Sequence, residues 1–119
     1  MTAVITVPSS LDDLTFETVV DQLAPYAPDE KVIIDARHTS FATPFGLTAL
    51  LTLAQTRAEK PEFLAPEDPD TTSYWARSGF FRFAEDLYSI RGHVPRPRSS
   101  GESDVLLEVT PITKSDIYR

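Results

Sequence analysis

The spacing of apolar residues changes from a strand period to a helix period within the first 25 positions of the chain. Residues 3–7 carry apolar side chains at every second position and are followed by Pro8, which predicts a short first strand. The next apolar residues recur at intervals of three and four positions: Phe16, Val19, Val20 and Leu23. This interval predicts an amphipathic helix, with Asp13 or Thr15 as its N-terminal cap.

An unbroken apolar run predicts the second strand. Residues 32–34 are Val-Ile-Ile, and such a run is typical of a strand that is covered on both faces in a parallel α/β sheet. Residues 37–42 then form a polar turn that leads to Thr43 and Pro44. Because threonine is a good N-terminal cap and proline suits the first helical position, this pair predicts a helix from residue 44 to about residue 58.

Shorter elements are predicted in the second half of the chain. Residues 63–65 predict a third strand, and Asp68 or Asp70 can cap a helix that ends at Gly79. The apolar residues that follow predict one further helical turn: Phe80, Phe81, Phe83 and Leu87.

The order of these elements predicts the fold. Residues 88–103 contain prolines and glycines and have almost no apolar period, so they predict a loop before a last strand at 105–109. The alternation of strands and helices predicts an α/β sandwich, with a small, mostly parallel or mixed sheet of about four strands. We expect one domain over residues 1–110, with a tail or connector at 111–119. The functional edge of such a sheet is where strands end and helices begin, which here is the segment 35–46.

Composition and charge narrow the classes of function. The chain has 119 residues, no cysteine and a net charge of −7. The absence of cysteine excludes disulfides and thiolate zinc sites, and the acidic charge disfavours binding to nucleic acid. Residues 1–36 contain seven acidic residues and one lysine, so most of the negative charge lies in the N-terminal third. No apolar stretch has the length of a membrane span or a signal peptide, and we expect a cytoplasmic protein that does not bind membranes.

Two segments resemble STAS domains, the family that includes anti-sigma factor antagonists. The first joins the strand that ends at Asp35 to residues 41–47, Phe-Ala-Thr-Pro-Phe-Gly-Leu, which look like the Asp-Ser-Ser-Gly-Leu motif of that family. The second is residues 74–80, which are similar to the family's helix that ends at a glycine before a large apolar residue. The resemblance implies a STAS-like sandwich that acts as a non-enzymatic regulatory module. Its implied partner is another protein, such as a histidine-kinase-type ATPase or an anti-sigma-like regulator, and homo-oligomerisation is left open.

The chain departs from the family at the position that receives phosphate. In STAS domains of this kind, the second serine of the motif is phosphorylated, and that position falls on Phe45 here. Thr43 and Pro44 stand in the places of the aspartate and of the first serine. The resemblance therefore carries over no phosphate acceptor, and we expect the phosphorylation switch to be absent.

The helix that follows Thr43 supplies the candidate binding surface. One of its stripes suits the core: Leu47, Leu50, Leu51 and Ala54. At about 100° per residue, a second face holds Phe45, Ala49, Thr52 and Thr56. Small and weakly polar residues around one aromatic are typical of a docking face, unless the 88–103 loop or the terminal segment covers them. The candidate partner-binding residues are Thr43, Pro44, Phe45, Gly46, Thr48, Ala49, Thr52 and Leu53.

Two other functions use residues of the same region. Asp35, His38 and Ser40 are the residue types of a hydrolytic triad, but no Gly-x-Ser-x-Gly motif accompanies them, so we predict no catalytic residue. We expect Asp35 to be structural and to accept hydrogen bonds from backbone N–H groups of the turn. The amides of residues 45–47 open a helix and favour an anion, so the alternative function is a sensor of a small anion or a nucleotide. No metal site and no cofactor are predicted.

Overall fold

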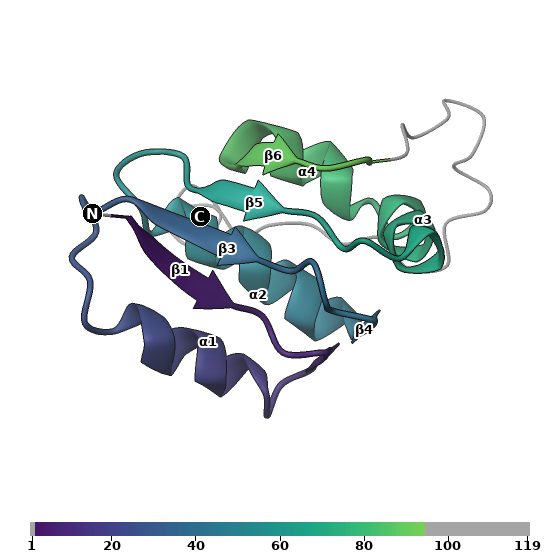
Figure 1. Cartoon of the computed structure of the whole chain (residues 1–119), viewed down its shortest axis with the longest axis horizontal. Coiled ribbons are helices and arrows are strands. Elements are labelled where there is room, and N and C mark those ends of the chain that lie inside the picture. Colours follow the sequence, from purple (N-terminus) through teal and green to yellow (C-terminus); the bar gives the residue numbers. More distant parts are fainter. Residues whose placement is uncertain (1, 95–119) are drawn as a thin grey trace, which may run out of the picture.

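Four parallel strands form one sheet, in the spatial order β1, β3, β5, β6 (Figure 1). The structure is a computed structural model that describes residues 2–94. The strands of this sheet are β1 (Ala3–Thr6), β3 (Val32–Asp35), β5 (Glu62–Leu64) and β6 (Ser89–Arg91). Two shorter strands pair in parallel with each other: β2 (Ser10–Leu11) and β4 (Phe41–Ala42). The predicted α/β class with a mostly parallel sheet of about four strands is confirmed.

The described residues also form four helices. They are α1 (Phe16–Leu23), α2 (Pro44–Gln55), α3 (Pro69–Arg77) and α4 (Phe80–Leu87). Figure 1 shows α2 and α4 behind the sheet and α1 alongside the edge strand β1. α2 ends earlier than predicted, and its last turn is tightened: the amides of Thr56 and Arg57 donate to the carbonyls three residues back, those of Leu53 at 3.0 Å and Ala54 at 3.2 Å. None of these helices is long and apolar enough to cross a membrane.

The register of the sheet shows which of its faces the helices cover. Ile5, Ile34 and Phe63 are neighbours across β1, β3 and β5, and all three are buried. Val4 and Ile33 come immediately before Ile5 and Ile34 in their strands, so their side chains point to the opposite face of the sheet. On that face Val4 is 55% exposed and Ile33 is partly exposed. Within residues 2–94, the expectation that the 32–34 run is covered on both faces is therefore wrong.

The core lies between the inner face of the sheet and the helices. The predicted stripe of α2 is buried there: Leu47, Leu50, Leu51 and Ala54. Next to it, the ring of Phe63 lies 5.1–6.4 Å, between ring centroids, from three other aromatic rings: Trp75, Phe80 and Tyr88. Aromatic pairs at such distances contribute about 0.5–1.5 kcal/mol each beyond the area that they bury. This cluster fixes α3 and α4 against the centre of the sheet.

The fourth strand is not the one that the sequence predicts. The segment 88–103 was expected to be a loop, but Ser89–Arg91 form β6, which pairs in parallel with β5. A strand of three residues is too short to show an apolar period, and it is fixed by its neighbours: the Ser89 amide donates to the Pro61 carbonyl at 2.9 Å. The strand predicted at 105–109 and the domain boundary at residue 110 lie outside the described residues.

Tyr88 anchors the start of β6 to the middle of α2. Its hydroxyl donates to the Leu50 carbonyl at 2.5 Å, and burial raises the pKa of the phenol far above its ordinary value. Tyr88→Phe removes this hydrogen bond without changing the ring, so the free energy of unfolding should fall by about 1 kcal/mol. Urea denaturation of the two proteins measures the difference. Tyr26→Phe, at an exposed tyrosine, is the matched control and should leave stability unchanged; equal stability of the Tyr88 variant and the parent would contradict the anchor.

Candidate functional site

The short β2–β4 ladder places the starts of α1 and α2 side by side. Ser10 pairs with Phe41, and Leu11 pairs with Ala42. The ladder continues into the cap of α2, because the Thr43 amide donates to the Leu11 carbonyl at 2.9 Å. Both helices leave this ladder from the same end, so their first turns are held close together.

A carboxylate that sequence reasoning missed fixes the chain where α1 begins. Oδ1 of Asp12 accepts the amides of Leu14 at 3.0 Å and Thr15 at 2.9 Å. These hydrogen bonds, that of the Thr15 amide foremost, hold the pKa of Asp12 below its ordinary value. Thr15 does precede the first helical residue, as predicted, but its hydroxyl donates to the Ser10 carbonyl at 2.7 Å instead of capping the helix. The start of α1 is thereby tied directly to β2.

The far ends of the two helices are joined by Arg57. Its Nη2 atom donates to the carbonyl of Ala27 at 2.6 Å and to the carbonyl of Glu30 at 3.0 Å. The neighbouring amide of Ala58 donates to the Pro28 carbonyl at 2.9 Å. The loop after α1 is therefore fastened to the end of α2, and the distance between the helices is set at both ends.

An apolar groove of about 510 Å³ lies between α1 and α2. It is lined by Phe16, Val20, Leu23, Phe45, Thr48, Ala49, Thr52, Leu53 and Thr56, none of which is charged. At one end the rings of Phe16 and Phe45 meet edge to face, with 6.5 Å between their centroids. Phe45 remains 55% exposed and Val20 48% exposed, so this apolar surface faces the solvent. Such exposure is the main feature that distinguishes this groove from the core.

Five of the predicted partner-binding residues line this groove: Phe45, Thr48, Ala49, Thr52 and Leu53. Thr43 does not line it and acts as the predicted cap, since its hydroxyl oxygen accepts the Gly46 amide at 3.1 Å. Pro44 begins α2 outside the groove. Gly46 is buried against Leu11, because a Cβ atom at this position would lie 2.8 Å from Leu11 Cγ. The structure thus places Gly46 in the packing between α2 and β2.

The wall supplied by α1 was missed by the sequence analysis. The helical period assigned Phe16, Val19 and Val20 to one buried face, but Val19 is buried while Val20 is almost half exposed. The four apolar positions of α1 span about 100°, the ordinary width of a stripe that packs on a core, so the pattern gave no signal that Val20 would face the groove. Sequence alone does not show which part of a stripe meets the core.

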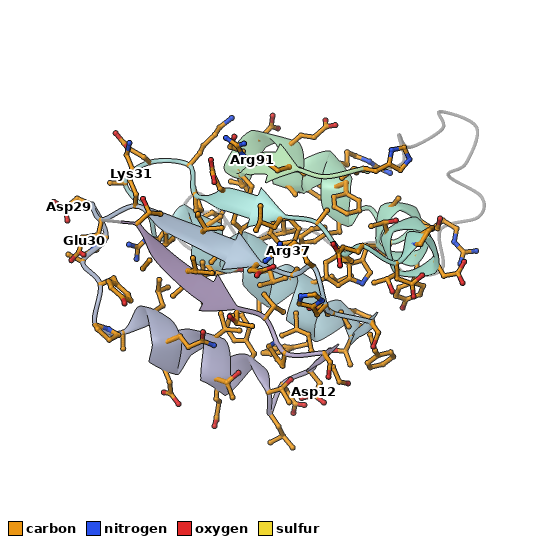
Figure 2. All side chains as sticks on the ribbon, in the orientation of Figure 1. Asp12, Asp29, Glu30, Lys31, Arg37 and Arg91 are labelled. Carbon is orange, nitrogen blue, oxygen red and sulfur yellow. The ribbon has the colours of Figure 1, made fainter. Side chains whose placement is uncertain are left out.

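Asp35 forms the hydrogen bonds that its predicted structural role requires. Its Oδ1 atom accepts the Arg37 amide at 3.1 Å, which confirms the expected hydrogen bond from the turn. The guanidinium of Arg37 adds two further bonds at 3.0 Å, one to each carboxylate oxygen, and sequence reasoning did not predict them. These side-chain hydrogen bonds hold the pKa of Asp35 below its ordinary value, against the opposing effect of burial. The pair fixes the turn that leads from β3 toward α2. Figure 2 labels Arg37 at this turn.

The lowered pKa predicts how stability depends on pH. The contribution of the Asp35 carboxylate is complete at neutral pH and is lost as the pH falls below the ordinary value of 3.8 and through the lowered pKa. Asp35→Asn should reduce the free energy of unfolding at pH 7 by about 1–2 kcal/mol, and this difference should shrink toward zero near pH 2. Urea denaturation across this pH range measures it. Asp86→Asn, at an exposed carboxylate on α4, is the control; a difference that does not vary with pH would exclude the carboxylate as its cause.

The other residues of the hydrolytic alternative have separate partners. His38 Nδ1 lies 3.8 Å from Glu67 Oε1, and the Ser40 hydroxyl donates to the Ser9 carbonyl at 3.2 Å. Asp35 itself is engaged by Arg37, so these contacts do not link the three residues into a relay. Among residues 2–94, no group of three or more His, Asp or Glu side chains is arranged to hold a metal ion.

The start of α2 offers few free donors to an anion. The Gly46 amide is taken by the Thr43 hydroxyl, and the Leu47 amide donates to the Thr43 carbonyl at 3.0 Å. Pro44 has no amide hydrogen at all. The anion or nucleotide alternative therefore gains no support from the geometry of this helix end.

No family model, no curated protein and no solved structure matches this chain.

Proposed function

We propose that this chain is a non-enzymatic regulatory domain of the STAS type that binds a helix of a partner protein in the groove between α1 and α2. The observation that carries the proposal is the position of Phe45. Its ring is more than half exposed, at the end of a groove that holds no charged side chain. Large side chains in well-packed pockets supply most of the binding energy of protein interfaces, and Phe45 is the large exposed side chain of this groove.

The energetics of the groove favour binding over a purely structural role. Burial of apolar surface contributes about 25 cal/mol for each Å² removed from water. About half of the surface of Phe45 and Val20 is still exposed to water and can be buried by a partner. The β2–β4 ladder and Arg57 fix the two helices before any partner arrives. Little ordering is then needed on binding, which reduces the entropic cost of association.

The resemblance supports a histidine-kinase-type ATPase as the partner. In the resembled family, the residue at the position of Phe45 is the serine whose phosphorylation controls the choice of partner. An aromatic ring at this place makes the contact permanently apolar, so we propose a docking surface that phosphorylation at this position does not regulate. We also predict that the purified protein has no hydrolytic turnover, because the hydrogen bonds of Asp35 and Ser40 go to Arg37 and to the Ser9 carbonyl.

Site-specific photo-crosslinking tests the proposal directly. A benzophenone-bearing phenylalanine analogue replaces Phe45 in the full chain, expressed in its native host, and mass spectrometry identifies what is captured. Phe41 is the matched control position, since it is 52% exposed, lies close in sequence and does not line the groove. The expected result is one protein that is captured from position 45 and not from position 41.

Three outcomes would count against the proposal. Equal capture from both positions would indicate a nonspecific apolar surface, and no capture from position 45 would remove the groove as an interface. Capture of a protein without an ATPase domain of the histidine-kinase type would leave the docking function standing and overturn the proposed partner class.

A further inference from the structure

The charges beside the groove point to the chemistry of its occupant. We infer that the groove takes an amphipathic helix with three apolar side chains along one stripe and Lys or Arg residues on the flank that faces α1. This inference rests on the proposed docking function and adds the class of partner segment to it.

The length of the groove fits a helix of about two turns. Because the β2–β4 ladder holds the starts of α1 and α2 together, residues equally far along the two helices should face each other across the groove. We call each such pair a level. The three predicted levels are Phe16 with Phe45, Val20 with Ala49, and Leu23 with Thr52. The first level is the observed ring contact, and all six residues line the groove. From the first level to the third, seven residues of helix span about 10 Å.

The spacing of these levels is that of another helix. Successive levels are separated by four and then three positions in both α1 and α2. Apolar side chains at i, i+4 and i+7 of a partner helix have the same axial spacing, so each can enter one level. An extended strand spans the same distance in about three residues and presents fewer side chains to the groove.

The two rims of the groove differ in charge. Around α1, at about 100° per residue, Glu17 and Asp21 lie on the side that faces away from Val19 and the core, and both are exposed. The rim formed by α2 is neutral, because no residue of 44–55 is ionisable. An occupant of the groove therefore meets a negative flank on one side only.

The acidic rim has no cation to compensate it within the described residues. Neither Glu17 nor Asp21 forms an ion pair there, and they stand four positions apart on the same helix face. Like charges at this spacing repel each other and destabilise the helix. A partner helix with lysine or arginine on that flank removes this repulsion and replaces it with attraction, whereas an acidic flank increases it.

Designed peptides test the chemistry without knowledge of the natural partner. Two fluorescent alanine-based peptides carry leucine at i, i+4 and i+7. Each has about 16 residues, a length at which such a peptide is partly helical in water. One peptide has lysines on both flanks of the leucine stripe, and the other has glutamates at the same positions. Fluorescence anisotropy with the full chain at low and high salt measures both affinities.

The expected result is that the lysine peptide binds at least about fivefold more tightly than the glutamate peptide, with a difference that shrinks at high salt. Glu17→Lys combined with Asp21→Lys should weaken binding of the lysine peptide at least about fivefold. Glu85→Lys combined with Asp86→Lys makes the same change in net charge on α4, away from the groove, and should weaken it less than about twofold.

Each failure has a separate meaning. Three results would overturn the inference that the occupant is a basic helix: equal affinity for the two peptides, no binding of either peptide, or equal effects of the two charge-reversed proteins. Whether the groove docks a partner at all would then be decided by the photo-crosslinking experiment. Binding of the lysine peptide that Phe45→Asp leaves unchanged would place it outside the groove and also overturn the inference. Concentration-dependent dimerisation that Phe45→Asp abolishes would assign the groove to a second copy of the chain instead.

Discussion

Phe45→Asp should abolish most of the partner binding and leave the fold almost unchanged. A side chain that a partner buries as an anchor contributes about 2 kcal/mol or more, so affinity for the crosslinked partner should fall by about 30-fold or more. Within the protein, the substitution removes one edge-to-face contact with Phe16, a loss of about 0.5–1.5 kcal/mol. An acid in the first turn of α2 recovers about 0.3–1 kcal/mol through the helix dipole. The net loss is then at most about 1.2 kcal/mol. The melting temperature should therefore fall by no more than about 5 °C.

The matched control for this prediction is Phe41→Asp, which makes the same chemical change at a side chain of similar exposure outside the groove. It should alter affinity by less than about threefold, because rim and peripheral contacts carry little binding energy. Titration calorimetry measures the affinity of both variants for the partner, and thermal unfolding measures their melting temperatures. A fall in stability of about 3–5 kcal/mol for Phe45→Asp would show that the ring is covered in the free protein and that the docking surface lies elsewhere.

Leu11→Ala should cost about 2–5 kcal/mol of stability, because Leu11 is fully buried where β2 meets α2. Gly46→Ala alone should also be destabilising. Its new Cβ atom would lie 2.8 Å from Leu11 Cγ and 2.9 Å from the Leu11 carbonyl oxygen. Overpacking of this kind costs about 1–3 kcal/mol, which exceeds the gain of about 1 kcal/mol in helix propensity.

The double variant distinguishes close packing from a general intolerance of Gly46. In the Leu11→Ala background the Cγ contact is gone but the carbonyl oxygen of residue 11 remains, so Gly46→Ala should stay destabilising and cost less than it does in the parent. The two effects should differ from additivity by about 0.5 kcal/mol or more. Urea denaturation of the four proteins of the cycle measures this coupling. Ile90→Ala, on β6 at the other edge of the sheet from β1, should combine additively with Gly46→Ala. Full additivity of the Leu11 pair would show that the Leu11 side chain takes no part in the close approach and that the backbone carbonyl alone causes it.

Features that depend on the local chain were determined by the sequence alone. Thr43 and Pro44 begin α2 as predicted, and the Thr43 hydroxyl caps the Gly46 amide. Gly79 separates α3 from α4 as predicted, with a φ of 93° that residues with a side chain rarely adopt. The core stripe of α2 and the exposure of Phe45 also followed from helical projection. In each case the cause lies within about one helical turn, where capping, backbone preference and periodicity act.

The tertiary structure alone decided which side chains form the site. Phe16 meets Phe45 because the β2–β4 ladder, between segments far apart in the chain, sets the starts of both helices. For the same reason Val19 faces the core while Val20 faces the groove, although both fit one apolar stripe. Hydrophobic burial depends on where neighbouring elements lie in space, and a single helix pattern does not encode that position. The sequence therefore specified one wall of the groove, and the packing of α1 against the fold supplied the other.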